Sequence, residues 1–391
     1  MLSAIKDIWF IARRELTAFG RRPIFLVIMF VAPLGFLWMF TSLMNAGLPT
    51  KLPAALVDED DTHVTRQLTR ILGTMEETNF VIRTKSFTQA REAMQRGQVY
   101  AIFRIPKGTT EAALTQRQPV ISFYTNDTYF VAASLLMKDM RKMSEMAGLA
   151  MTRATMRAQG FRDDQIMGTL QPVVVESHPL GNSYLNYSVV LTNLIVPGLL
   201  MLVIMLTTSY SMGIEWKRGS QKELFEMGKG RVAVVVLGKL LPQTMLYTII
   251  FWLIDIIFYS YLQFPCQCGI LRMTLWGFLA VLASQGFGLL MFEAFPGQMR
   301  MAMSACSLLG VMQFSLAGFS FPVSAMDLPF QWLSNIFPLH HYFLIYVNQC
   351  LNGYSISYTW PNVVALVAIY LLPQIFSFRL RDAFLYKEYK A

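Results

Sequence analysis

The sequence predicts a helical membrane protein of six spans with an α/β domain inserted after the first span. Three observations lead to this prediction. Only 15% of the 391 residues are charged, whereas soluble domains carry about 25%. The charged residues avoid several long apolar windows, which is typical of membrane spans alternating with aqueous segments. One stretch, residues 45–185, instead carries charges of both signs and alternating strand and helix patterns.

Residues 1–22 predict an amphipathic helix at the cytoplasmic membrane surface. Apolar residues recur at steps of three and four positions, namely Ile5, Ile8, Trp9, Ala12, Leu16 and Phe19. The other faces hold the charged residues Lys6, Asp7, Arg13, Arg14 and Glu15. A helix of this kind beside a span lies along the membrane surface or packs on a partner, and the two arrangements are compatible.

Residues 23–44 predict the first span. No charged residue occurs between Arg22 and Lys51, and the apolar run is long enough for a bilayer core of about 30 Å at a rise of about 1.5 Å per residue. Pro33 lies within this run and is tolerated in membrane helices. Because the charged stretch before the run is too long for a typical signal peptide, we expect an uncleaved span.

Residues 45–185 predict a separate domain with a mixed sheet. Short apolar runs at 54–57, 80–83, 100–105 and 120–124 indicate strands, and residues 62–72, 88–96, 108–116 and 130–160 indicate helices. This alternation is typical of a small α/β domain. The acidic run from Asp58 to Thr62 lacks the glycine and the last glutamate of a calcium loop. It fits a strand end that leads into a helix N-cap.

The remaining residues, 186–391, predict spans two to six. The apolar runs are 187–212, 241–262, 273–292, 301–321 and 363–378. A basic loop, residues 213–240, separates the second and third spans, and a semi-polar aromatic segment, residues 322–361, precedes the last.

The distribution of basic residues predicts the orientation. Sixteen Lys and Arg lie in the N-terminal segment, the 213–240 loop, the 293–300 turn and the C-terminal tail, against one, Arg272, in the short loops of the opposite side. Short basic segments stay in the cytoplasm, whereas long domains cross the membrane regardless of charge. We therefore expect cytoplasmic termini and an extracytoplasmic 45–185 domain.

Motifs for most chemistries are missing from the sequence. Gly238-Lys239 is followed by Leu240 and lacks the glycine spacing of a phosphate-binding loop, so ATP would have to bind another polypeptide. No catalytic triad, zinc spacing or nucleic-acid signature is evident. We expect neither a cofactor nor a metal on this chain, and no nucleic-acid partner.

Two polar features of the apolar segments are candidate functional residues. Asp255 lies deep inside a predicted span, where a carboxylate is costly and by default a functional candidate. It would bind substrate, carry a proton or pair across helices. His340 and His341 lie in the predicted outer segment; a metal pair, a proton relay and ordinary interface-level polar residues are the alternatives.

Three of the four cysteines predict a disulfide. Cys266, Cys268 and Cys350 lie on the same predicted outer side, so we expect Cys350 to pair with one of the other two. The C-x-C spacing without further ligands is too sparse for a metal site.

Several segments together resemble the ABC type-2 permeases. The entry segment has Arg13, Arg14, Glu15 and Leu16, like the basic interfacial helix of the family. Residues 98–108, QVYAIFRIPKG, are similar to a stretch in the family's outer domain. Residues 215–224, EWKRGSQKEL, followed by GKLLP at 238–242, look like the family's cytoplasmic signature. The chain departs from it at Ser220, where threonine is common, and at 225–230, where a proline often follows.

The resemblance implies the architecture of a type V exporter. In that architecture two six-span permeases, identical or similar, pair in the bilayer, and two P-loop ATPase subunits bind ATP and Mg below them. The implied ATPase-coupling residues are Arg13, Arg14, Glu15, Glu215, Arg218, Gly219, Ser220, Glu223, Leu224 and Lys239. Residues 322–345 would form re-entrant helices that cap a substrate pathway containing Asp255, Phe321, Pro322 and His340. A bacterial inner membrane is the expected location, and a periplasmic adaptor is a further expected partner.

Three classes of function compete. The favoured one is export of a lipophilic or amphipathic compound from the cytoplasm or inner leaflet, driven by ATP hydrolysis on a partner chain. The second is a membrane receptor or scaffold that binds through the 45–185 domain, and the third is a membrane enzyme. The enzyme lacks a nucleophile or base cluster, and a receptor does not require the 215–242 signature.

Overall fold

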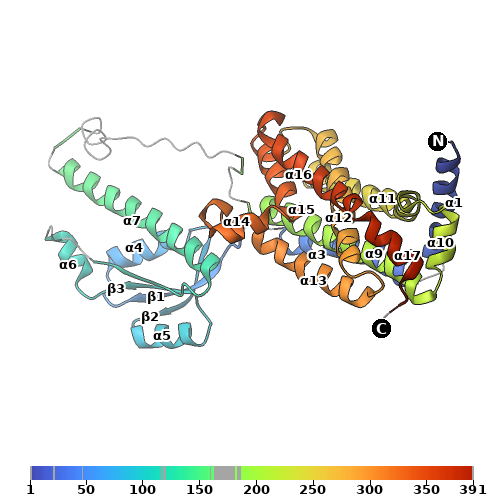
Figure 1. Cartoon of the computed structure of the whole chain (residues 1–391). Helices are drawn as coiled ribbons and strands as arrows, with labels where there is room; N and C mark the ends of the chain where they lie inside the picture. Colours follow the sequence, from blue (N-terminus) through green and yellow to red (C-terminus); the bar gives the residue numbers. More distant parts are fainter. Residues whose placement is uncertain are drawn as a thin grey trace. The chain divides into compact units, whose positions relative to one another are not determined.

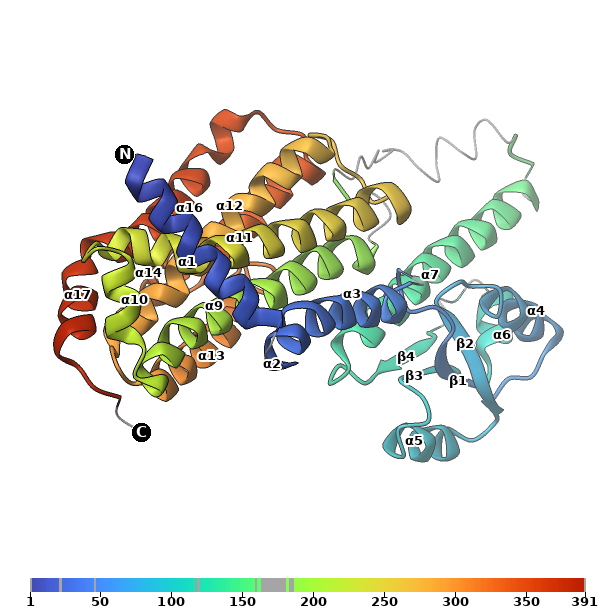
Figure 2. The same cartoon turned by 90° about the vertical axis from the view of Figure 1, so that its right-hand side faces the viewer.

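A computed structural model describes residues 2–20, 23–45, 47–115, 117, 120–158, 160–162, 181–182 and 186–389. The chain divides into two compact units, residues 48–177 and residues 1–47 together with 178–391. Figures 1 and 2 show the two units from directions at right angles. Each is described by itself.

The unit of residues 48–177 is built on a four-stranded sheet with the order β2-β1-β3-β4. The strands are β1 (Leu52–Asp58), β2 (Thr78–Thr84), β3 (Ala101–Ile105) and β4 (Ser122–Thr125). β1 is parallel to both β2 and β3, whereas β3 and β4 are antiparallel. Each strand overlaps a run that the sequence indicates. The sheet is therefore mixed, with the antiparallel strand β4 at one edge, and α6 (Thr109–Leu114) lies between β3 and β4 in the sequence.

Helices cover both faces of this sheet because the β1 side chains alternate between them. Ala54 and Leu56 pack with α4 (His63–Leu72) and α7 (Phe130–Ala158). Ala55 and Val57 pack with α5 (Phe87–Gln95) on the opposite face. The Thr62 hydroxyl accepts the Thr65 amide at the start of α4 in a capping box, so the acidic run does lead into a helix N-cap.

The other unit is a bundle of helices. The interfacial segment is α1 (Leu2–Gly20), and the first long helix is formed by α2 (Pro23–Leu26), a π-helical stretch (Val27–Val31) and α3 (Ala32–Leu43). After the inserted unit come α9 (Asn193–Arg218), α10 (Gln221–Met227), α11 (Val232–Ile256), α12 (Ile270–Ala294) and α13 (Met299–Leu316). The chain ends with α14 (Leu328–Ser334), α15 (Pro338–Ile345), α16 (Ile356–Ile375) and α17 (Ser377–Tyr386).

Five helices in the described part of the chain are long and apolar enough to cross a membrane. They cover Pro23–Leu43, Ser188–Arg218, Val232–Tyr261, Ile270–Ala294 and Ile356–Tyr386. The predicted fifth span corresponds to α13, which has 18 residues and packs along α9 but is not among the five. The count of six spans therefore stays a prediction, and it depends on α13.

Glycines allow the long helices to approach closely. A Cβ added at Gly288 of α12 would lie 2.6 Å from the Met205 carbonyl oxygen of α9. A Cβ added at Gly286 would lie 2.6 Å from Cα of Tyr370 in α16. Small residues at crossing points are how membrane helices bring their backbones together, so α12 is held tightly between α9 and α16.

The 213–240 segment is not a loop, which corrects the prediction. α9 continues to Arg218, α10 occupies Gln221–Met227 and α11 begins at Val232, so only short turns remain. The polar residues near the ends of α9 and α11 interrupt the apolar pattern but continue the helices. Of these residues Glu215 and Lys239 are buried and paired with each other, whereas Lys217 and Arg218 are exposed.

Candidate functional site

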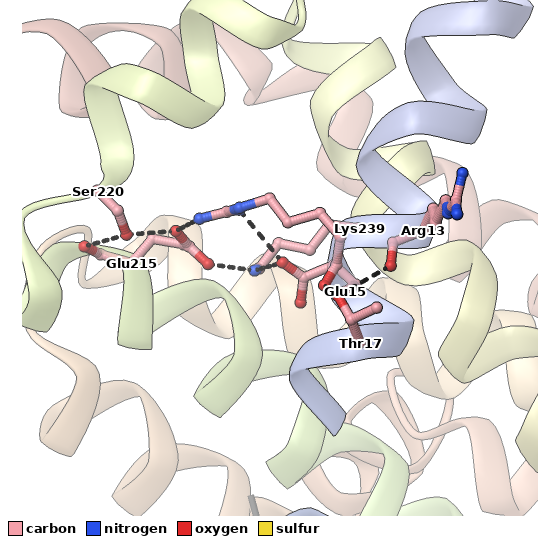
Figure 3. A network of polar contacts seen from close by, with 7 residues as sticks. Arg13, Glu15, Thr17, Glu215, Ser220 and Lys239 are labelled. Atoms are coloured by element: carbon pink, nitrogen blue, oxygen red, sulfur yellow. Dashed lines mark hydrogen bonds and ion pairs between the residues drawn. The ribbon is translucent and has the colours of Figure 1, made fainter. Parts of the chain in front are cut away.

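A buried network of charged side chains joins α1, α9 and α11 (Figure 3). The Lys239 ammonium donates to Glu15 Oε1 and to Glu215 Oε1, each at 2.7 Å. The Arg14 guanidinium donates to Glu215 Oε2 at 2.9 Å and lies 3.4 Å from Glu15 Oε1. Two cations thus face two carboxylates, and the four side chains have no net charge at neutral pH.

Apolar packing places these charged groups together. Ile11 of α1 is fully buried beside Val235 and Leu240 of α11. Gly238 lies where the two helices meet, because a Cβ there would be 2.8 Å from Ile11 Cβ. Figure 2 shows α1 crossing α11. Lys239, the residue after this glycine, consequently meets Glu15, one helical turn beyond Ile11.

The end of α9 is shaped around Glu215. Gly219 adopts a left-handed conformation with φ of 71° and ends the helix, which a residue without Cβ does at little cost. The Ser220 amide then donates to the Glu215 carbonyl oxygen at 3.0 Å, and the Ser220 hydroxyl donates to Glu215 Oε2 at 2.6 Å. Glu215 is therefore held by three side chains from three segments.

Burial governs the energetics of this network. Lys239 is 0% exposed, Glu215 2% and Glu15 4%. A buried ion pair adds little net stability because removing the charges from water is costly, but breaking it leaves a charge unpaired. Burial lowers the pKa of Arg14, yet its hydrogen bond to Glu215 and the nearby carboxylates outweigh this and raise the pKa. The network thus favours one arrangement of the three helices.

A second ion cluster ties α1 to the turn before α11. Asp7 accepts from Lys229 Nζ and from an Arg231 guanidinium nitrogen, each at 3.0 Å. Both cations are well exposed, so these pairs contribute little energy. Sequence reasoning did not single out Asp7, and its place on the charged face of an amphipathic helix was the only signal available.

A cluster of aromatic side chains joins α9, α10, α12 and α17. Trp216 lies 5.2 Å from Phe292 and 4.8 Å from Phe384 between ring centroids, and Phe225 stacks on Phe384 at 5.3 Å. These rings belong to one apolar cluster with Ile11. The sequence did not indicate that the C-terminal helix takes part in this junction.

The predicted coupling residues separate into two groups. Arg13, Arg218, Gly219 and Glu223 are exposed, and Figure 3 shows the Arg13 side chain pointing away from the network. Glu15, Glu215, Leu224 and Lys239 are buried, with Arg14 and Ser220 between these extremes. In this conformation these four side chains have little or no exposed surface, and their ATPase-coupling role stays a prediction.

The predicted pathway residues differ in their exposure, and their role stays a prediction. Asp255 is 1% exposed, and its Oδ2 atom has no hydrogen-bond partner among the described residues. His340 is buried with Nδ1 3.0 Å from the Ala317 carbonyl oxygen. Phe321 and Pro322 are exposed. The 322–345 segment contains the short helices α14 and α15, whose re-entry into a bilayer stays a prediction.

The three predicted disulfide partners lie close together as thiols. Cys266 and Cys268 each interact with Cys350 through their sulfur atoms, and the Cys350 thiol donates to the Pro265 carbonyl oxygen at 3.3 Å. All four cysteines lie in the described part of the chain, and none of them forms a disulfide bond. Within the described ranges, no group of three or more His, Cys, Asp or Glu is arranged to hold a metal ion.

Apolar helices joined by a buried network of charged side chains define the architecture of this unit. The family model described as ABC-2 family transporter protein matches residues 23–378. The chain belongs to the ABC-2 transporter family. No curated protein matches it.

Membership in the ABC-2 family fits the apolar helices. This family comprises membrane subunits of ABC transporters, which are generally not catalytic themselves and associate with ATPase subunits. Together with five candidate membrane helices, membership makes this chain a multi-pass ABC permease. The matched residues include α9 to α16, whereas α1 and all but the first two residues of α17 lie outside the match.

Proposed function

We propose that this chain is the permease subunit of an ATP-driven exporter and that its α1–α9–α10–α11 junction receives the motion of the ATPase. The observation that supports this most is the fully buried Lys239, bonded to Glu15 of α1 and Glu215 of α9. The exposed residues Arg13, Arg218 and Glu223 then supply the contact surface. The buried group makes that surface rigid.

Rigidity matters because a docking motion reaches the spans only through elements that move together. Separating α1 from α9 or α11 would leave a buried charge without its partner, at a cost of about 3–5 kcal/mol. A displacement of α10 or α1 is therefore transmitted to the end of α9 and to the beginning of α11. Asp7, Lys229 and Arg231 add a second attachment on the same side.

The basic residues support an orientation with this junction in the cytoplasm. Figure 1 shows the two ends of the described chain, α10 and α17 at the same end of the helical unit, where the predicted cytoplasmic connections lie. Residues 45–185 would then be extracytoplasmic. We further propose pairing with a second permease, identical or similar, two ATPase subunits carrying ATP and Mg, and a bacterial inner membrane as the location.

The proposed cargo is a lipophilic or amphipathic compound taken from the cytoplasm or the inner leaflet. Support comes from the apolar helices and from α11, which has no charged side chain between Lys239 and Asp255. Asp255 is the group in that helix best placed to interact with a polar part of a cargo molecule.

Co-purification tests the docking surface. The intact chain is expressed in its native host with an affinity tag, and ATP hydrolysis is measured on the purified complex. The double variant Arg13→Glu with Arg218→Glu should lose the ATPase and its activity, because it inverts two exposed charges of the contact surface and keeps the four side chains of the buried network. Arg91→Glu, an exposed charge in the other unit, is the matched control.

Transport is tested with the complex in liposomes that contain a fluorescent-headgroup lipid. ATP should increase the fraction of this lipid on one leaflet, and the docking double variant should abolish that increase. Retention of the ATPase and of ATP-driven movement in the double variant would refute the docking surface. A chain that co-purifies with no ATPase while binding a ligand through residues 48–177 would instead support the receptor.

A further inference from the structure

A long groove of about 800 Å³ lies between α1, α11, α12 and α16. Its α11 wall runs from Val236 to Trp252, a distance of about 24 Å at the rise of an α-helix. Ile8 of α1 lines it as well, three residues before the Ile11 contact with Gly238. The volume is that of a small-molecule site, and the length suits one extended hydrocarbon chain.

The groove faces the hydrocarbon of the membrane. Three of its wall residues, Met245, Ile249 and Trp252, are 57%, 60% and 45% exposed, respectively. All three lie in a candidate membrane span. None of the described residues lining the groove is charged. An occupant would therefore enter from the bilayer and carry no charge within the groove.

Two buried polar side chains interrupt this apolar lining. Gln285 is 1% exposed and its Nε2 atom has no partner among the described residues. Thr248 is 7% exposed and its hydroxyl likewise has no described partner. Leaving such groups unsatisfied in an apolar setting costs about 1–3 kcal/mol each. A hydrogen-bonding ligand would remove that cost.

The Thr244 hydroxyl beside Gln285 restricts which polar group of a ligand would fit. Thr244 Oγ1 lies 3.0 Å from the Leu240 carbonyl oxygen and 2.8 Å from Gln285 Oε1. A hydroxyl has only one proton, and the two ends of an amide are assigned from the bonds they make. If the Gln285 amide donates to Thr244, its oxygen is left to accept a proton. A ligand hydroxyl can both donate and accept, so it satisfies Gln285 in either orientation.

We propose that this groove binds a single long-chain lipid alcohol, with its hydroxyl at Gln285 and Thr248 and its chain along α11. The polar pair lies near the middle of α11 and α12 rather than at their ends, so a phospholipid headgroup would not reach it. The occupant is a bound lipid and is independent of the ATPase contact. By contacting Ile8 it also supports α1 against α11.

Photolabelling of the intact chain tests the proposal. The purified chain in lipid nanodiscs is incubated with hexadecanol carrying a diazirine, irradiated and digested for mass spectrometry. We expect label on the peptides that contain residues 236–252 and 282–289. Unlabelled hexadecanol should compete, whereas hexadecane should compete about fivefold less well, the equivalent of one net hydrogen bond of about 1 kcal/mol.

Two variants and one control make the test specific. Leu241→Trp fills the groove and should remove the label. Gln285→Leu should keep the label but abolish the preference for the alcohol over the alkane. Gln243→Leu is the control, because Gln243 is fully buried in α11 with an unpartnered amide among the described residues but does not line the groove.

Three outcomes would overturn the proposal. Label spread evenly over the exposed faces of all the long helices would mean that the probe reports only the bilayer. Equal competition by hexadecane would mean that the polar pair recognises nothing. Full label on nanodiscs that hold one copy of the chain, with none on nanodiscs that hold two copies, would make this face a subunit interface.

Discussion

Lys239 and Glu215 stand 24 positions apart, and their charged atoms meet at 2.7 Å inside the protein. Lys239 has no exposed surface, although it lies in the first half of a helix that follows a basic turn. Its ammonium is shared between the ends of α1 and α9. In this permease the cation therefore serves the packing of three helices rather than an external contact.

Lys239→Met should strongly destabilise the protein. The substitution keeps an apolar side chain of similar length but leaves Glu15 and Glu215 with only Arg14 between them, which costs about 3–5 kcal/mol. Thermal unfolding of the detergent-solubilised chain measures the loss. Lys229→Met, which removes an exposed pair with Asp7, should cost at most about 1 kcal/mol. Equal effects of the two substitutions would contradict the internal role of Lys239.

Gly238→Ala should loosen α1. The added Cβ would lie 2.8 Å from Ile11 Cβ and 3.0 Å from the Ile8 carbonyl oxygen, so the helices must move apart at a cost of about 1–3 kcal/mol. Protease cleavage within α1 should become faster. Gly35→Ala is the control, since a Cβ there meets no described atom within 4 Å and alanine favours the helix. Unchanged cleavage in Gly238→Ala would show that α1 does not depend on this contact.

Asp60→Asn should weaken the 48–177 unit in a pH-dependent way. The Asp60 carboxylate accepts the Thr110 hydroxyl and the amides of Thr110 and Gly108, and these bonds lower its pKa. The pKa of Asp60 is lower in the folded state than in the unfolded state, where it is about 3.9. The ionised carboxylate therefore stabilises the fold at pH values above the unfolded pKa. The stabilisation is lost as the pH falls through the folded pKa.

Hydrogen exchange of the β1 and β3 peptides measures this effect in the intact chain. At neutral pH Asp60→Asn should exchange faster than the wild type, and the difference should shrink when both are compared below about pH 4. Asp127→Asn, which removes a carboxylate that accepts a hydrogen bond from the exposed Thr125 hydroxyl, is the control. A difference between Asp60→Asn and wild type that is constant with pH would argue against a role for the carboxylate charge.

Mild oxidation should link Cys350 to Cys266 or Cys268. Their thiols already lie together, and an oxidant would take two electrons while two protons leave with the new sulfur–sulfur bond. Intact mass should fall by two hydrogens and be restored by a reductant. Cys350→Ser should prevent the change, whereas Cys306→Ser should not, because Cys306 is buried elsewhere beside Ser209. A disulfide in the Cys350→Ser chain would identify a different pair.

Asp255→Asn should leave the fold intact and test the cargo site. A buried carboxylate is expensive in the membrane interior, and Oδ2 lacks a partner among the described residues, so an amide of the same shape should not lower the melting temperature. ATP-driven lipid movement should nevertheless fall if the acid contacts cargo. Normal movement in Asp255→Asn would remove this residue from the pathway, and a lower melting temperature would instead indicate a structural partner.

Much of the architecture could be predicted from local patterns. Apolar windows located the long helices that are candidate membrane spans, since an uncharged run of sufficient length has few soluble alternatives. The strand and helix runs between 52 and 125 were located because alternation and turn residues act over short distances. α13 shows the limit of prediction from apolar windows. Arg300 and Gln313 lower the mean hydropathy of this helix, and its place in the bundle depends on packing against α9.

The division between buried and exposed coupling residues depended on the tertiary structure. The signature residues 215–224 and 238–242 were recognisable from sequence, as were Arg14 and Glu15, and the resemblance implied the same ATPase-coupling role for residues in all three segments. Lys239, Glu15 and Glu215 become partners only because α1 crosses α11 at Gly238 and α9 ends beside them. Local sequence determined which groups are charged, whereas the crossing of helices distant in sequence decided which of those charges could be neutralised and buried.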